Sequence, residues 1–232
     1  MGSIGEKHLS RLASSKRWNI KKKGIKWVAK PLPGPHNIKN GIHLLSVFRD
    51  MLNYAQTAKE VKKILTNQEI YVDGKRRKNH RFIVGLMDVL FIPKTKEAFR
   101  ILLTNKGKLT LMPIDEKESS FKLSKIIGKR HIKKKIQLNL FDGKNILVDK
   151  ADYKVGDTLM IDVPSLKIKD SFAFTKGNCI YLTGGKHIGT SGILEEIKEK
   201  TITIKRNKEL IKTSKNHAFV VGKEKLVIKI EK

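Results

Sequence analysis

Apolar residues first recur at helical spacing shortly after Gly41. They lie three or four positions apart and predict an amphipathic helix with the buried face Leu44, Val47, Phe48, Met51, Leu52 and Ala55. Thr57 precedes Glu60 by three residues, which is the spacing of a capping box and predicts the start of a second helix. Its apolar face would comprise Val61, Ile64 and Leu65, with its lysines pointing elsewhere.

Strand patterns follow the two helices. The segment EIYVDGKRRK places Ile70 and Val72 on one face of a strand and turns at Asp73–Gly74, which predicts a hairpin. The apolar run VGLMDVLFI, residues 84–92, predicts one buried strand. From about Phe99 onward, short strands alternate with turns at Gly107 and at Asp142–Gly143, which is typical of small barrels or barrel-like sheets. A last strand is expected at KLVIKI, residues 225–230.

These elements predict an α+β, multi-domain chain: a small helix-helix-sheet module followed by β-rich domains. The expected divisions are an N-terminal arm (1–40), the helix-helix-sheet module (41–105), a central β-domain (106–171) and a final unit (172–232). The arm contains three prolines within residues 30–36, and its one acidic residue, Glu6, stands among many lysines and arginines. We expect it to be extended and poorly ordered alone, with Trp18 and Trp27 available to stack or pack.

The net charge of the chain narrows the set of possible functions. The 232-residue chain carries 50 Lys+Arg against 22 Asp+Glu, a formal net charge of +28. Such self-repulsion favours a polyanionic partner, and nucleic acid is the commonest one. The single cysteine, Cys179, excludes an intrachain disulfide, and no apolar run approaches a membrane span. We therefore expect a cytoplasmic protein with no membrane partner.

The glycine-rich stretch LTGGKHIGTSGILEEI, residues 182–197, raises the question of a phosphate-binding loop. Gly184 and Gly189 have the spacing of a P-loop, but Thr190 stands where that motif needs lysine. The residues after Gly192 predict a hairpin, whereas a P-loop must open a helix. The alternatives are an ordinary turn without a ligand, or a tight turn whose backbone and tip (Gly185, Lys186, His187) approach an RNA phosphate chain.

Enzymatic chemistry finds little support. Asp88 in GLMD invites comparison with the catalytic aspartate of RNA pseudouridine synthases, but the arginine that should precede that aspartate is absent, so a structural aspartate is favoured. The histidines are not spaced as metal ligands, and the lone cysteine gives no zinc cluster. We expect no catalytic residue, metal, cofactor or small-molecule substrate.

Basic clusters beside tight turns are present instead. They predict one extended surface that contacts many phosphates, with arginines as the best ligands because they bind phosphate bidentately. From this clustering we expect RNA contacts at Lys21, Lys22, Lys23, His36, Lys59, Lys62, Lys63, Lys75, Arg76, Arg77, Lys78, His80, Arg81, Lys129, Arg130, Lys133, Lys134 and Lys135.

Three segments together resemble the S-four-e family of small-subunit ribosomal proteins. They are KHLSRLASSKRW with PGPH, the helix-helix-VDGK module with GLMDV, and GNCIYLTGGKHIGTSGILEEI. The resemblance implies an RNA-binding module at about 41–105 and a final KOW unit, an SH3-like barrel whose glycine turn meets RNA. It also implies ribosomal RNA and neighbouring small-subunit proteins as partners, no DNA, and RNA contacts at Lys7, His8, Arg11, Lys16, Arg17, Trp18, Lys186 and His187.

The leading hypothesis is therefore a structural ribosomal protein that helps small-subunit RNA to fold. Two alternatives remain open at this point: an RNA modifier of the pseudouridine synthase type that uses Asp88, and a KOW-bearing transcription or translation factor.

Overall fold

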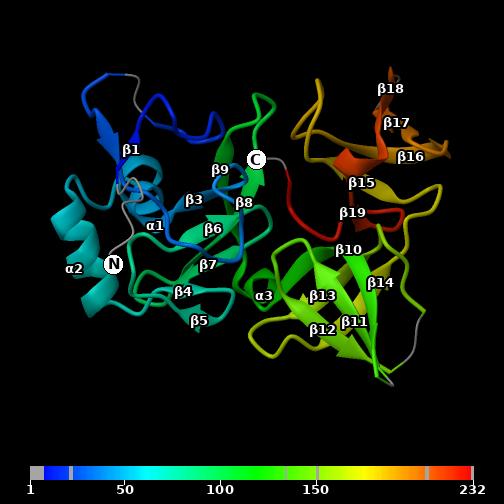
Figure 1. Cartoon of the computed structure of the whole chain (residues 1–232), viewed down its shortest axis with the longest axis horizontal. Helices are drawn as coiled ribbons and strands as arrows, with labels where there is room; N and C mark the ends of the chain where they lie inside the picture. The colour runs from blue at the N-terminus through cyan, green and yellow to red at the C-terminus, as the bar shows by residue number, and fades with distance from the viewer. Residues whose placement is uncertain (1–7, 21–22, 134, 150–151, 207–208, 231–232) are drawn as a thin grey trace, which may run out of the picture.

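The computed structural model describes residues 8–20, 23–133, 135–149, 152–206 and 209–230. The fold is mostly β, and α1 and α2 lie together at one end, whereas α3 lies near the middle (Figure 1). The helices are α1 (Leu44–Ser46), the π-helical turn η1 (Val47–Met51), α2 (Ala58–Asn67), α3 (Glu116–Ser119) and the 3-10 turn η2 (Lys215–His217).

The second expected helix is confirmed, and the first is shorter than expected, because Leu52 and Ala55 lie beyond its end. α1 and η1 form the first, which ends at Met51, and α2 is the second. At the start of α2 the Thr57 hydroxyl accepts from the Glu60 amide, and the Glu60 carboxylate accepts from the Thr57 amide. This capping box satisfies amides that have no partner within the helix, which is why the helix begins there.

The helices cover a five-stranded sheet of order β5-β4-β7-β8-β9. Its strands are β4 (Tyr71–Val72), β5 (Lys75–Arg76), β7 (Val89–Ile92), β8 (Glu97–Leu103) and β9 (Leu109–Ile114), beside a small pair made of β3 (Gly41–His43) and β6 (Ile83–Gly85). The hairpin at Asp73–Gly74 is confirmed. The division expected at residue 105 lies within the β8–β9 hairpin.

The single strand expected over residues 84–92 is also wrong. Met87 has φ +67, and the Asp88 amide bonds back to the Gly85 carbonyl at 3.1 Å. This turn separates β6 from β7 and places Asp88 at the junction between them. Apolar residues continue through the turn because Leu86 and Met87 are themselves buried, so the hydrophobic pattern does not mark the break.

The central sheet has the order β12-β11-β10-β13-β14. Its strands are β10 (Phe121–Ile132), β11 (Lys135–Leu140), β12 (Asn145–Val148), β13 (Thr158–Asp162) and β14 (Ile168–Phe172). The long strand β10 pairs with β13 along its first part and with β11 along its second. The expected turn at Asp142–Gly143 joins β11 to β12.

The last sheet has the order β18-β17-β16-β15-β19. Its strands are β15 (Cys179–Leu182), β16 (Ser191–Ile197), β17 (Thr201–Arg206), β18 (Glu209–Ser214) and β19 (Ala218–Gly222). The strand expected at residues 225–230 is wrong, since this segment forms no ladder. It is nevertheless anchored, because Ile228 and Ile230 are buried in the largest apolar core.

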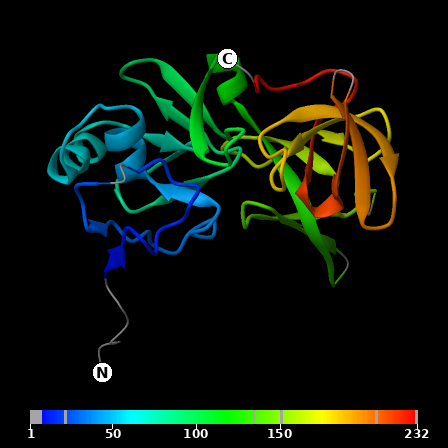
Figure 2. The same cartoon turned by 90° about the horizontal axis from the view of Figure 1, so that it is seen from above.

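The described part of the N-terminal arm is packed against the rest of the chain, which corrects the expectation of an extended segment. Strands β1 (Leu9–Ser10) and β2 (Trp27–Val28) pair with each other, and Trp18 and Val28 join the same large core as Phe48. The Trp18 indole donates to the Gly41 carbonyl at 2.6 Å and stacks on His43 with ring centroids 5.0 Å apart. Figure 2 shows the arm lying beside the helices and β3.

Candidate nucleic-acid interface

The first group of basic residues lies where α2 meets the segment that follows β5. The Arg76 guanidinium donates to the carbonyl of Thr66, near the end of α2, at 3.4 Å, and Arg77 lies over the Phe82 ring at 4.2 Å. Burial and the nearby charges of Lys62 and Arg81 lower the pKa of His80. We call the set Lys62, Arg76, Arg77, His80 and Arg81 the basic face.

The arm borders this basic face. Arg81 donates from Nε to the Lys30 carbonyl at 2.6 Å, and its own carbonyl accepts from the Leu32 amide at 3.0 Å. The arm and the cluster around Arg81 therefore meet in space, although Lys30 and Arg81 are 51 residues apart in sequence, as the extended-surface hypothesis requires.

A second junction joins the arm to the glycine-rich loop. Arg17 donates from Nη2 to the Thr183 carbonyl at 3.3 Å, and its carbonyl accepts from the Leu109 amide at 2.8 Å. Burial lowers the pKa of this guanidinium. Thr183 directly precedes the loop whose tip carries the exposed Lys186. The arm and the loop therefore contribute basic residues to one region of the surface.

The loop glycines divide into two kinds. Gly185 has φ +85 and is exposed, with only ordinary contact expected for an added Cβ. Gly189 has φ +78, and a Cβ there would lie 2.6 Å from the Thr104 carbonyl oxygen. The close approach that Gly189 permits is therefore to the β8–β9 turn of the same chain. Strand β16 begins at Ser191, which confirms the hairpin and leaves the loop without the helix that a P-loop opens.

The third group lies along β10 and β11. Arg130, Lys133 and Lys135 are exposed, whereas the Lys129 ammonium donates to the Tyr153 carbonyl at 2.9 Å. Figures 1 and 2 place the far part of this hairpin and α2 toward opposite ends of the molecule. The basic residues are thus distributed along the whole length of the fold.

Two predicted contacts require correction. Trp18 is 4% exposed and His36 is 7% exposed, so neither ring can stack on or bind an external base. The resemblance implies the Trp18 contact and the basic clustering predicts the His36 contact, but each side chain is held by protein groups. The Trp18 indole bonds to Gly41, and His36 Nε2 lies 2.8 Å from the Asp88 carboxylate.

The remaining predicted residues divide by exposure. The exposed ones are His8, Lys16, Lys23, Lys59, Lys62, Lys63, Lys75, Arg76, Lys78, Arg130, Lys133, Lys135, Gly185 and Lys186. The partly buried ones are Arg11, Arg17, Arg77, His80, Arg81, Lys129 and His187. Lys7, Lys21, Lys22 and Lys134 lie outside the described residues.

Sequence reasoning missed a buried group of charges, which we call the aspartate–lysine cluster: Asp73, Asp88, Lys122, Asp142 and Lys144. The Lys122 ammonium lies 2.8 Å from Asp73 and 2.9 Å from Asp142, and it also contacts Asp88. Lys144 lies 2.6 Å from Asp73 and 3.3 Å from Asp142. These residues come from the helix-helix-sheet unit, from β10 and from the β11–β12 turn, so the cluster joins two sheets.

Electrostatics within the cluster favour the charged forms of Lys122, Asp73 and Asp142. Burial alone would lower the pKa of Lys122, but the carboxylates of Asp73, Asp88 and Asp142 raise it well above its ordinary value. Burial alone would raise the pKa of Asp73 and of Asp142, but the two lysines hold both below the usual carboxyl range. The cluster is thus a set of mutually dependent ion pairs.

Asp88 has a structural role in this cluster. One carboxylate oxygen contacts Lys122, and the other accepts from the Gly85 amide at 2.8 Å and lies beside His36. The residue is 1% exposed, so no substrate could reach it without unfolding the junction. A Cβ at Gly85 would come 2.4 Å from His36 Cγ, which explains the glycine. The expectation of a structural aspartate is confirmed.

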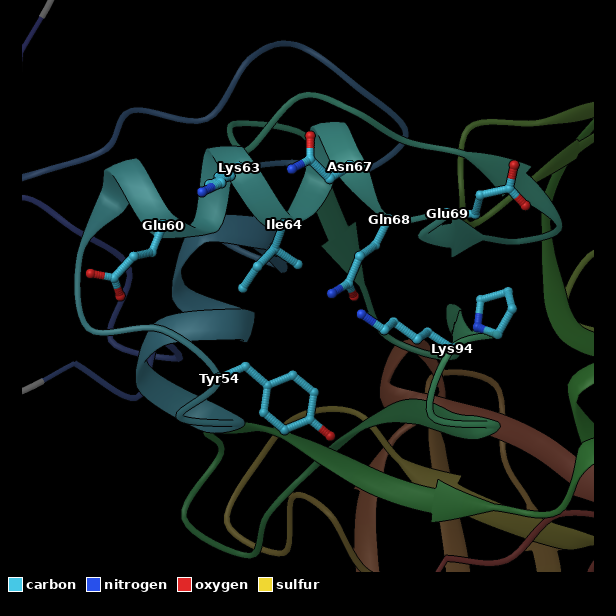
Figure 3. Close-up of a pocket in the computed structure, with 9 residues that line it drawn as sticks. Tyr54, Glu60, Lys63, Ile64, Asn67, Gln68, Glu69 and Lys94 are labelled. Atoms are coloured by element: carbon cyan, nitrogen blue, oxygen red, sulfur yellow. The ribbon is translucent and has the colours of Figure 1, made fainter.

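A groove of about 530 Å³ runs beside α2 (Figure 3). Lys63 and Lys94 line it together with Glu60 and Glu69, so its charge is mixed. Glu60 already takes part in the capping box. Burial, followed by the hydrogen bond between the Tyr54 hydroxyl and Glu97, raises the pKa of Tyr54 to about 12. The groove therefore offers neither a cationic lining for a polyanion nor an activated nucleophile.

Two further features of the described residues bear on the chemistry. Within the part of the chain that the structure describes, no three His, Cys, Asp or Glu side chains are grouped to hold a metal ion. The described helices include none with the length and apolar character needed to span a membrane.

Comparison with known proteins gives consistent matches. The model of "Ribosomal family S4e" matches residues 95–168, and that of the "RS4NT (NUC023) domain" matches residues 4–39. The chain is 45% identical to small ribosomal subunit protein eS4 of Methanosphaera stadtmanae, over 99% of this chain and 98% of that protein. It is 40% identical to the eS4 protein of Methanothermobacter thermautotrophicus, over 97% and 96% respectively.

A solved structure is also similar. The crystal structure of the 30S ribosomal protein S4e from Thermoplasma acidophilum superposes with a TM-score of 0.71 at 32% identity. The match covers 81% of this chain and 97% of that one. The sequence comparisons and the structural comparison thus match the same family over most of the chain.

Proposed function

The chain belongs to the ribosomal S4e family, and from this premise we propose that it is a structural constituent of the small ribosomal subunit that binds small-subunit ribosomal RNA. The observation that carries the proposal is 45% identity over 99% of the chain with a protein named for that subunit. Its place would be in the ribosome, in the cytoplasm, beside neighbouring small-subunit proteins.

The finer parts of the proposal concern which units meet the RNA. We take α1, α2 and the sheet ending at β9 as an RNA-binding module, and the five strands β15–β19 as a KOW unit with its glycine loop at Gly184–Gly189. The basic face and the Arg17–Thr183 contact support this assignment, because they bring the arm beside both units. Arginine and lysine side chains there would neutralise phosphates.

The enzymatic alternative loses its candidate residue. A pseudouridine synthase needs an accessible aspartate, whereas Asp88 is buried and has partners on both carboxylate oxygens.

Salt-dependent binding to transcribed small-subunit ribosomal RNA tests the RNA contacts. Each neutralised phosphate contributes a slope of about −0.7 to −0.9 to log K against log salt, so 6–10 contacts should cost roughly three to five decades between 50 and 200 mM. Arg76→Ala should reduce the slope by about one contact. A flat salt dependence in the natural protein would contradict the proposal.

The matched control removes an equal charge elsewhere. Lys205 lies on β17 and pairs with Glu195 at 3.3 Å, outside the predicted contacts. Lys205→Ala should leave the slope unchanged. Stoichiometric sedimentation of the tagged protein with small-subunit particles would separately test whether it is a constituent; loss from the particles during a gradient at moderate salt would instead favour an exchanging factor.

A further inference from the structure

Trp27 presents an indole that the fold does not use internally. It lies on β2, where strand alternation buries Val28 and leaves Trp27 50% exposed. The other tryptophan, Trp18, is 4% exposed and bonded to Gly41. The two tryptophans of the arm therefore have opposite roles: one is a core residue and the other is a surface ring.

The surroundings of this ring are cationic and aromatic. The Lys26 ammonium lies 5.2 Å from the Trp27 ring centroid, and the His8 ring centroid lies 5.5 Å away, tilted by 44°. Residues 8–40 contain no acidic side chain, and Lys23 beside them is exposed. An anionic ligand with a flat face would satisfy both the charge and the ring.

We propose that Trp27 is a stacking platform for an unpaired base of the bound RNA, with Lys26 and His8 beside the adjoining backbone. Aromatic rings on a basic surface are how proteins hold single-stranded nucleic acid, because every base has a π-face and every linkage a phosphate. The proposal deepens the proposed function and rests on it, since it specifies an unpaired segment where duplex backbone contacts alone would not need the ring.

Three variants of the full chain separate stacking from charge, with transcribed small-subunit ribosomal RNA as the probe. Trp27→Ala should weaken binding by about 5- to 100-fold and leave the salt slope unchanged, because it removes no charge. Trp27→Phe should recover much of that loss, since a smaller ring still stacks. Lys26→Ala should instead reduce the slope by about 0.7–0.9. Equal melting temperatures of the free proteins would show that the exposed position does not affect folding.

Fluorescence reads the ring directly. The natural protein has two tryptophans and Trp27→Phe has only Trp18, so the difference in tryptophan emission between the two proteins isolates Trp27. RNA should quench this difference signal and protect it from acrylamide. Tight, salt-dependent binding with an unchanged Trp27 signal, and with Trp27→Ala as tight as the natural protein, would overturn the platform while leaving the proposed function intact. Absence of RNA binding would overturn both. Protection of Trp27 only on adding other small-subunit proteins would assign the ring to a protein contact and also overturn the platform.

Discussion

Replacing Lys122 with methionine should destabilise the fold more than replacing any exposed lysine. The Lys122 side chain is 2% exposed and is the cation shared by Asp73, Asp88 and Asp142. Methionine fills similar space but leaves three buried or nearly buried carboxylates with one lysine, Lys144. Removing one member of a buried ion pair costs about 3–5 kcal/mol, mainly because the remaining charge stays desolvated.

This cost is large for a domain whose total stability is of order 5–15 kcal/mol. At about 2–4 °C per kcal/mol for a chain of this size, the melting temperature should fall by about 6–20 °C. The matched control is Lys144→Met in the same cluster. Lys144 is 24% exposed, and its two carboxylates keep Lys122, so we expect a loss of about 1 kcal/mol.

The pH dependence supplies the refuting measurement. The folded pKa values of Asp73 and Asp142 lie below their unfolded values, so their stabilisation is present above about pH 4 and is lost as the pH falls through the folded values. Without Lys122 these carboxylates should take up protons more easily when folded. Urea unfolding at pH 7 and pH 4 should therefore show the gap between variant and natural protein narrowing in acid. A loss below 1 kcal/mol at pH 7, or a gap that widens in acid, would refute this reasoning.

Two further predictions concern buried groups. His43 is fully buried, and burial, followed by the charge of Arg49, lowers its pKa to about 4. Up to about 3 kcal/mol of the free energy of unfolding should therefore be lost as the pH falls from about 6.5 to 4, and His43→Phe should lack this pH-dependent loss in urea unfolding. Gly189→Ala should cost about 1–3 kcal/mol, because it combines a strained positive φ with contact to the Thr104 carbonyl. Gly177→Ala is the control for strain alone, since it has φ +89 and open space, and an equal loss in both variants by thermal melting would contradict the contact.

Local signals predicted the local structure well. The capping box at Thr57 and the Asp-Gly turns at residues 73–74 and 142–143 were recognisable because each motif satisfies its own backbone within a few residues. The break at Met87 was not recognisable, because both sides of the turn are buried and the apolar run continues through it. Segment 225–230 looks like a strand for the same reason: its isoleucines are buried without a partner strand.

Long-range contacts explain the errors in the candidate interface. The basic residues that surround Trp18 and His36 in the sequence predict that both side chains are exposed. In the structure the Trp18 indole is hydrogen-bonded to Gly41, and the His36 ring to Asp88, which is 52 residues away. Lys122 had no local signal either. It alternates with apolar residues in β10 like an ordinary surface lysine, and its burial depends on carboxylates supplied by other elements.

Buried contacts between the units affect how an extended basic surface can bind RNA. The basic residues are distributed from α2 to the β10–β11 hairpin. They should bind one RNA more tightly if their spacing is fixed, because each freely moving unit would have to be ordered on binding. The Tyr181 hydroxyl bonds to the Leu103 backbone at 2.9 Å, Arg17 bonds to Thr183, and Lys122 joins β10 to the helix-helix-sheet unit. Each contact crosses between units and uses directional polar groups. If they hold the spacing, Lys122→Met should weaken RNA binding at temperatures where the variant is still folded, although Lys122 itself lies too deep to touch RNA.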